Sequence, residues 1–423
     1  MSAPRRLRVL AFACAVFIAV SAFSSQSALA AKSAGEPAVS YARFDLAAGA
    51  YSGVALSKGT LSLASRGLAS GTYTDPYGYG AIAEQYGTWT TAPYAVPFAF
   101  DELVASWNAT TPNGTWISVE MQAGGSGRTT KWYTMGIWAS GDGTIHRTSV
   151  GGQGDSDGYV AIDTFVRDGK APPLTTYTLR VTLHRVAGST ATPTLSSLGA
   201  MTSAASMYAI PSAFTLGREV DLDVPQYSQE IHAGQFPEYD GGGEAWCSPT
   251  STSMVLSYWH SGPTSADLAT WPAALAYADP QVDYAARYVY DYHYQGAGNW
   301  PFNAAYAASF TGMRGFVTRL RSLAEAERFI AAGIPLVASI QGKLPGFFFK
   351  KTSGHLLVIR GFTASGDVIS NDPAVPDDTQ VRKIYGRADF EDVWLSGSGG
   401  IVYVIVPSGT SLPANVEGLP NNW

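Results

Sequence analysis

The sequence predicts an α+β fold class, with an N-terminal antiparallel β-sandwich domain followed by a domain of helices and a sheet. Short segments that alternate apolar and polar residues, separated by turn clusters about every ten residues, fill the first half. Helix signals followed by apolar strand-like runs fill the second half. The chain has 423 residues, of which 46% are hydrophobic and 14% charged, and this length suggests two domains.

Residues 31–200 carry the strand pattern. Leu179, Val181 and Leu183 fall on one face of the segment 178–184, and residues 116–121 alternate in the same way. Turns are predicted at residues 111–114, 124–127 and 140–143. We therefore expect a β-sandwich accessory domain here, with its core filled by the tryptophans of this half. These tryptophans are Trp89, Trp107, Trp116, Trp132 and Trp138.

The second half has a different organisation. A low-charge stretch predicts a linker at residues 201–215, a second domain at 216–408 and an extended tail at 409–423. Pro249 opens one helix, and Ser322 with Glu325 matches a capping box that opens another. Helices are expected at 249–259, 282–292 and 323–332, and strands at 334–340, 355–361 and 401–406.

The N-terminus resembles an export signal. Arg5, Arg6 and Arg8 precede an apolar run at 9–23, and Ala28 and Ala30 give a small-x-small cleavage pattern. We expect residues 1–30 to be a signal peptide cleaved after about Ala30 and the protein to be secreted, with no membrane span. The net charge of −6 becomes more negative without these arginines, which argues against nucleic-acid or anionic-membrane partners.

One cysteine then remains in the mature chain. Cys14 lies in the predicted signal peptide, so Cys247 has no intramolecular disulfide partner. A lone thiol is a liability outside the cytosol, and it is either a small buried apolar residue or a nucleophile. Because Pro249 starts a helix just after it, Cys247 is expected at a helix N-terminus, which stabilises a thiolate. This position favours the nucleophile.

A nucleophilic thiol needs a base, and three histidines follow Cys247. His260 ends the same helix, roughly 20 Å away at 1.5 Å per residue. His293 lies among tyrosines, whereas His355 opens an apolar strand after a flexible Thr-Ser-Gly segment. The strand position favours His355 as the base.

Asp372 is the predicted orienting carboxylate. A hairpin with a four-residue loop at 362–365 would pair Asp372 with His355. A two-residue turn would instead pair Asp372 with Ile359, and the idea would fail. Asp367 is the competing carboxylate, but it lies in the turn itself.

Four segments resemble the bacteriocin-processing type of cysteine peptidase, which includes double-glycine leader peptidases and belongs to the papain-like superfamily. They lie at residues 224–229, 246–259, 354–362 and 371–374, in the order of that family. The resemblance spans about 220–406 and implies a papain-like α+β domain. It implies that Cys247 is the nucleophile, His355 the general base and acid, Asp372 the orienting residue and Gln229 the oxyanion-hole glutamine.

Two departures from the family pattern concern the site. Ser248 follows the nucleophile where the family commonly has glycine, and seventeen residues separate Gln229 from Cys247. Gln235 lies in that insertion and is the alternative oxyanion residue. Leader-cutting members are domains of membrane transporters, whereas no membrane span or ATP-binding motif is found in this sequence.

The leading interpretation is a secreted cysteine peptidase that acts on peptide or protein substrates through an acyl-enzyme intermediate. The alternatives are a papain-like amidase or transglutaminase acting on cell-wall peptides, and a catalytically inert binding protein. No His, Cys and Asp residues have zinc-ligand spacing, so no metal or other cofactor is predicted. Trp246 could form a wall of the site, and residues 343–351, with three phenylalanines, are expected either to pack or to line the cleft.

Overall fold

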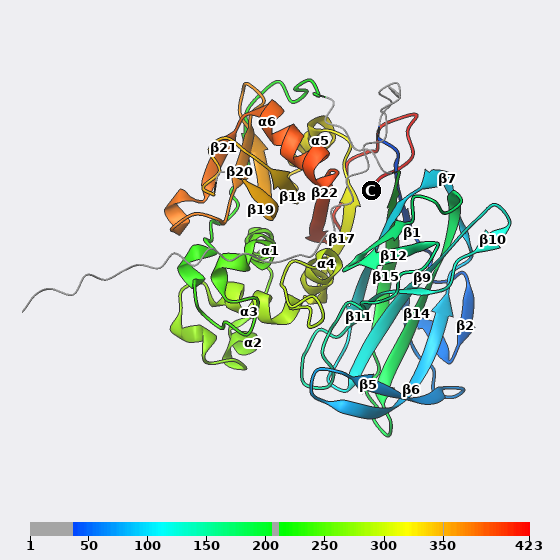
Figure 1. Cartoon of the computed structure of the whole chain (residues 1–423). Helices are drawn as coiled ribbons and strands as arrows, with labels where there is room; N and C mark the ends of the chain where they lie inside the picture. Colours follow the sequence, from blue (N-terminus) through cyan, green and yellow to red (C-terminus); the bar gives the residue numbers. More distant parts are fainter. Residues whose placement is uncertain (1–36, 205–210, 350) are drawn as a thin grey trace, which may run out of the picture. The chain divides into compact units, whose positions relative to one another are not determined.

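A computed structural model describes residues 37–204, 211–349 and 351–423 (Figure 1). The predicted signal peptide at residues 1–30 lies outside the described residues. The structure confirms the α+β class, with a β-rich N-terminal part and a C-terminal part that combines helices with a sheet. All strand pairs between named strands of the described residues are antiparallel.

The N-terminal part consists of two sheets. The first contains, in spatial order, β12 (Gly158–Ala161), β13 (Thr164–Arg167), β8 (Glu102–Thr110), β15 (Thr194–Ser203), β4 (Thr60–Leu63) and β3 (Val54–Ser57), and β1 (Val39–Arg43) pairs with β15. The second contains β10 (Arg128–Thr129), β9 (Thr115–Gly125), β14 (Leu174–Val186), β6 (Gly80–Thr90) and β2 (Ala50–Ser52). In the second sheet β11 (Tyr133–Trp138) pairs with β9, β5 (Ala69–Asp75) with β6, and β7 (Tyr94–Phe100) with β14.

Alternation along the strands determines the core of these sheets. Leu179, Val181 and Leu183 of β14 are fully buried, as their period of two predicts. The tryptophans follow the prediction with one exception, Trp132, which is half-buried. The guanidinium carbon of Arg180 lies over the Trp132 ring, 4.1 Å from the ring centroid. The fully or almost fully buried ones are Trp89, Trp107, Trp116 and Trp138.

The C-terminal sheet contains, in order, β17 (Met313–Arg319), β22 (Ile401–Pro407), β18 (Leu336–Gly342), β19 (Thr352–Phe362), β20 (Val368–Asn371) and β21 (Arg382–Tyr385), with β16 (Val220–Asp221) paired to β19. The helices are α1 (Cys247–Tyr258), α2 (Ser265–Ala269), α3 (Pro280–Val289), α4 (Trp300–Ser309), α5 (Leu323–Ala331) and α6 (Arg387–Glu391). The predicted helices at 249–259, 282–292 and 323–332 correspond to α1, α3 and α5.

Both faces of this sheet are covered. Val337, Val358 and Tyr403 belong to an apolar cluster with residues of α1, α3 and α4. Their neighbours Ala338 and Ile359 belong to a second cluster, which contains residues of α5 and α6. Alternate side chains of one strand therefore enter different cores, and α1 lies against the face of β19 opposite to α5.

The N-terminal sheets and the C-terminal part share an apolar core. Phe302 of α4 packs with the rings of Trp107 and Trp138, at centroid distances of 6.1 and 5.3 Å. The side chain of Asn108 on β8 donates a hydrogen bond of 2.7 Å to the carbonyl of Gly315 on β17. These contacts attach the first sheet to helix α4 and strand β17.

The predicted linker at 201–215 needs a correction at its start. Residues 201–203 belong to β15, which pairs with both β1 and β8. Their low charge reflects a buried strand, since Met201, Thr202 and Ser203 are all almost inaccessible. Residues 205–210 lie outside the described residues.

Candidate active site

Cys247 is the first residue of α1, and Trp246 precedes the helix as its N-cap residue. Among the described residues, the backbone N–H of Cys247 has no hydrogen-bond acceptor, as is usual in the first turn of a helix. The Cys247 side chain is partly exposed, whereas the following residues 248–256 are buried. The structure thus leaves the thiol accessible at the end of a buried helix, next to free backbone donors.

Trp246 does not form a wall of the site, contrary to our expectation. Its side chain is fully buried, and the indole N–H donates a hydrogen bond of 2.7 Å to the carbonyl of Tyr239. The indole therefore anchors the segment before the helix to the core.

Two hydroxyl groups fix α1 against the C-terminal sheet. Ser251, one turn after Cys247, donates a hydrogen bond of 3.1 Å to the carbonyl of Leu356, the residue that follows His355. The hydroxyl of Ser248 lies 3.0 Å from that of Tyr403 on β22. Ser248, which stands where the resemblance led us to expect glycine, therefore has a hydrogen-bond partner in the sheet.

His355 and Asp372 form a buried pair. The Nε2 atom of His355 lies 2.7 Å from Oδ1 of Asp372, and the exposed fractions of their side chains are 5% and 1%. The phenol of Tyr385 donates a hydrogen bond of 2.5 Å to Oδ2 of Asp372, and the backbone N–H of Ala374 donates to Oδ1 at 3.0 Å. The carboxylate is therefore held at both oxygen atoms, and it fixes the ring of His355 in turn.

The electrostatics of the pair favour an imidazolium. Burial alone lowers the pKa of His355, but the Asp372 charge, the hydrogen bond with Asp372 and the adjacent Cys247 side chain raise this pKa to about 10. Burial raises the pKa of Asp372, but the charge and hydrogen bond of His355 outweigh it and lower the pKa below its usual range. Because Nε2 is bonded to Asp372, Nδ1 is the nitrogen that remains for the thiol.

The contact between His355 and Asp372 arises from a strand register that differs from the predicted one. Val358 pairs with Asn371, and after a bulge Phe362 pairs with Val368, so the loop comprises residues 363–367. His355 itself pairs with Ile340 of β18. The predicted pairing of His355 with Asp372 is therefore wrong, because the loop is one residue longer and lies further along the chain than predicted, and the bulge reverses only part of the resulting shift. Asp372 follows the end of β20, and its side chain still reaches His355.

Gln229 lies close to the segment before Cys247. Its side-chain nitrogen donates hydrogen bonds to the Glu244 carbonyl at 2.6 Å and to Oε1 of Glu230 at 3.1 Å, and its own Oε1 is buried without a partner. A Cβ atom on Gly243 would lie 2.3 Å from the Gln229 carbonyl, so only glycine permits this approach. Gln235 instead bonds to His232 and to the carbonyl of Ile231.

The other candidates lie elsewhere. His260 is exposed just after the end of α1. The ring of His293 lies directly against the backbone of Gly151, where an added Cβ atom would come within 2.2 Å of it. Asp367 accepts a hydrogen bond of 3.1 Å from the backbone N–H of Arg387. In the described part of the chain, no hydrogen bond joins His260 or His293 to Cys247.

Tyr385 and Glu230 also lie near the pair and were not predicted from the sequence. Phe347 lies there too, and it belongs to the segment 343–351 that was expected to pack or to line the cleft. Burial raises the pKa of Glu230, as does repulsion from Glu244, and the charge of His355 opposes this increase. The ring of Phe347 packs on the imidazole of His355, with 5.1 Å between the centroids. The contact between Tyr385 of β21 and Asp372 cannot be found from the sequence alone, since nothing in the local sequence around Tyr385 indicates it.

Phe348 and Phe349 follow directly and are exposed at 54% and 49%. Their rings contact each other edge to face, with 4.9 Å between the centroids. The segment 343–351 therefore divides its phenylalanines, with Phe347 packed against His355 and its two neighbours facing solvent. Lys350 lies outside the described residues.

The described residues contain no group of His, Cys, Asp and Glu side chains arranged to hold a metal ion. Within residues 37–204, 211–349 and 351–423, no helix is both long and apolar enough to cross a membrane.

Comparisons with known proteins point to one family. The family model described as the Peptidase C39 N-terminal domain matches residues 38–203, and the model described as the Peptidase_C39 like family matches residues 221–401. A solved structure of a C39-like peptidase from Bacillus anthracis is 16% identical and covers 45% of this chain and 100% of its own, with a TM-score of 0.28. A search of curated proteins found no match.

The two family matches and the residues around Cys247 define a cysteine-type peptidase. The chain belongs to the C39 peptidase family, since the N-terminal and peptidase models of that family match successive parts of it.

Proposed function

We propose that this protein is an exported cysteine peptidase that hydrolyses peptide bonds through Cys247, His355 and Asp372. The observation that carries the proposal is the buried 2.7 Å contact between His355 and Asp372, with the Cys247 side chain adjacent to the imidazole. A thiol, an imidazole and an orienting carboxylate in this order are the groups that acyl transfer requires.

In the first step, the Cys247 thiolate attacks the carbonyl carbon of the scissile amide while His355 is an imidazolium. The negative charge that develops on the carbonyl oxygen is stabilised by the free N–H of Cys247 at the helix N-terminus and by the amide of Gln229. His355 then donates its Nδ1 proton to the leaving nitrogen. The C–N bond breaks, the amine product departs, and a thioester with Cys247 remains.

In the second step, water attacks the thioester. Neutral His355 removes a proton from the water, a second tetrahedral species forms, and the C–S bond breaks. The acid product leaves, and the sulfur and ring return to the thiolate–imidazolium pair. Asp372 acts throughout by holding the ring and stabilising its positive charge.

Gln229 requires one rearrangement for this role. Both hydrogens of its amide nitrogen are directed at the Glu244 carbonyl and at Glu230, at 2.6 and 3.1 Å. Release of the longer bond to Glu230 frees a donor for the developing oxyanion. Gln229 is a stronger candidate than Gln235, whose amide bonds to its own turn.

The N-terminal segment supports export. We propose that residues 1–30 are removed and that the mature chain begins at Ala31, with the β-rich part as an accessory domain. N-terminal sequencing of protein recovered from the culture medium tests this proposal. A sequence beginning at Met1 would contradict cleavage.

Peptide cleavage tests the activity. Mature protein is incubated with a peptide library and with cell-wall peptides, and the products are identified by mass spectrometry. We expect new C-termini with the wild-type protein, none with Cys247→Ala, and unchanged products with the control His260→Ala. Cleavage that persists in Cys247→Ala would contradict the proposal, and products joined to an added amine would indicate transfer in place of hydrolysis.

A further inference from the structure

A cavity of about 330 Å³ lies between the first N-terminal sheet, β17 and the C-terminal tail. Its walls include Tyr41 and Arg43 of β1, Arg314 and Phe316 of β17, and Leu412 and Trp423 of the tail. None of the residues assigned to peptide hydrolysis lines it. Its volume lies within the range of about 300–1,000 Å³ that is usual for small-molecule sites, which often form where separate parts of a chain meet.

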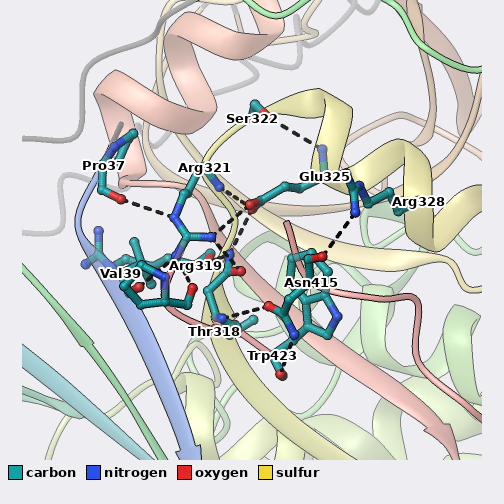
Figure 2. A network of polar contacts seen from close by, with 12 residues as sticks. Pro37, Val39, Thr318, Arg319, Arg321, Ser322, Glu325, Arg328, Asn415 and Trp423 are labelled. Atoms are coloured by element: carbon teal, nitrogen blue, oxygen red, sulfur yellow. Dashed lines mark hydrogen bonds and ion pairs between the residues drawn. The ribbon is translucent and has the colours of Figure 1, made fainter. Parts of the chain in front are cut away.

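The tail is held firmly against this cavity. Figure 2 shows Arg321 bonded to Glu325 and to the chain at Pro37 and Val39. The same guanidinium donates hydrogen bonds to the Pro420 carbonyl at 2.5 Å and to the Asn422 side chain at 2.7 Å. The side chain of Arg321 thereby ties the start of β1 and the end of the tail to one buried point.

Further contacts fix the tail wall itself. The backbone N–H of Tyr41 donates a hydrogen bond of 2.7 Å to the Asn421 carbonyl. The indole of Trp423 packs on Phe329 of α5, with 5.0 Å between the centroids, and donates a hydrogen bond of 2.7 Å to the Pro413 carbonyl. The cavity therefore has walls that are formed before any ligand arrives, which lowers the cost of binding.

Two arginines provide the charge of the cavity. Within the described residues, neither Arg43 nor Arg314 forms an ion pair with a carboxylate, and no acidic side chain lines the cavity. Arg314 donates a hydrogen bond of 2.6 Å to the Thr410 carbonyl, but its Nε is buried without a partner. Burial lowers the pKa of Arg314, and the like charge of Arg43 lowers it further. An anion placed here would offset both the repulsion and the missing hydrogen bond.

The remaining wall is apolar and aromatic. The rings of Tyr41 and Phe316 contact each other with 4.8 Å between their centroids. Leu412 and Trp423 line the cavity from the tail. A ligand that fits both kinds of wall carries a negative head group on a short apolar body.

We propose that this cavity binds a small amphipathic anion, with a carboxylate or phosphate head group held by Arg43 and Arg314 and an apolar body packed on Tyr41, Phe316 and Trp423. Planar guanidinium groups suit both head groups, because carboxylate and phosphate each present oxygen atoms that accept a pair of guanidinium N–H groups. Since the tail forms one wall, bound ligand also stabilises the docked tail by mass action.

The test uses the mature full-length protein and four eight-carbon probes. Octanoate and octyl phosphate carry the two head groups, and 1-octanol and octylamine are the neutral and cationic controls. Isothermal titration and thermal unfolding are followed with each probe. We expect saturable binding and a raised Tm with at least one anion, with at least tenfold weaker binding of both controls; the tighter anion identifies the head group.

Substitutions show whether binding occurs in this cavity. Arg43→Met and Arg314→Met should each weaken binding of the preferred anion at least tenfold, whereas the exposed Arg66→Met should leave it unchanged. Arg43 is exposed at the end of β1, so its substitution remains informative if Arg314→Met fails to fold. Equal binding of octanol, absence of saturable binding by both anions, or full affinity in Arg43→Met would overturn the proposal.

Discussion

The hydroxyl of Ser251 donates a hydrogen bond of 3.1 Å to the carbonyl of Leu356, which joins the helix that begins with Cys247 to the strand that contains His355. Residues four apart lie on the same face of a helix, so Ser251 follows Cys247 along the surface that meets β19. The relative placement of Cys247 and His355 thus depends on a contact one turn away from the thiol.

We expect Ser251→Ala to lower kcat/KM about fivefold, because a loss of roughly 1 kcal/mol in a buried hydrogen bond loosens this placement. The matched control is Ser257→Ala, which removes a hydroxyl 3.1 Å from that of Tyr227 near the other end of the same helix. Steady-state kinetics on one peptide substrate compare the two variants. Equal activities would show that the Ser251 contact has no role in alignment.

The raised pKa of His355 predicts an alkaline limit for hydrolysis. The imidazolium must protonate the leaving amine, so kcat/KM should fall as the pH rises through about 10. Asp372→Asn removes the largest contribution that raises this pKa, and the fall should then move to lower pH. A pH–rate profile measures both positions, and an unchanged alkaline limit in Asp372→Asn would argue against His355 as the acid.

The stability of the folded protein should depend on pH through the same two groups, His355 and Asp372. The folded-state pKa of His355 lies above its unfolded value of 6.5, so its stabilisation is complete below about pH 6.5 and is lost as the pH rises to about 10. The pKa of Asp372 is lowered, so its contribution is present above its unfolded value and is lost as the pH falls through the folded value. Thermal unfolding across this pH range should show both losses in the wild type, and Asp372→Asn should abolish the acid-side one.

Substitution of the two glutamines distinguishes the candidates for the oxyanion hole. We expect Gln229→Ala to lower kcat by about 10²–10³, the usual cost of losing one donor, and Gln235→Ala to leave it nearly unchanged. Gln235 is the matched control because it lies in the same insertion and bonds to His232 and Ile231. The opposite order of effects would assign the donor to Gln235.

The exposed phenylalanines are predicted to receive an apolar substrate side chain. Because Phe347 packs on His355, its exposed neighbours Phe348 and Phe349 lie in a segment adjacent to this histidine. Replacing both with alanine should lower turnover of the preferred peptide at least tenfold, while iodoacetamide reacts with Cys247 as before. Tyr159→Ala removes an aromatic ring that is 48% exposed in the N-terminal part and serves as the control. Unchanged rates on all peptides would assign specificity elsewhere.

Sequence patterns predicted the elements with strong local signals. Alternation predicted β9 and β14, and the proline, the capping box and apolar runs predicted α1, α5, β18, β19 and β22. Helix α4 was missed because its residues are apolar on most sides, although Asn299 accepts a hydrogen bond from the Phe302 N–H as an N-cap and Pro301 lies in the first turn. Those two residues were an available signal.

The long-range contacts of the site could not be predicted from the sequence. Helix position indicated the proximity of Cys247 to free N–H groups, but the register that brings Asp372 to His355 depends on a bulge and a longer loop. Gly366, with φ +92°, lies in that loop and permits the longer turn. Tyr385 reaches Asp372 only because β21 pairs with β20, and no local pattern indicates such a long-range contact.

The rate at which iodoacetamide alkylates Cys247 tests the central claim most directly. If His355 and Asp372 activate the thiol, native protein at pH 6–7 should react faster than free cysteine, and His355→Ala should react at least tenfold more slowly than the wild type. The control His260→Ala should react at the wild-type rate. Protection of Cys247 until the protein is denatured would show instead that the thiol is a packed core residue, and would contradict the account.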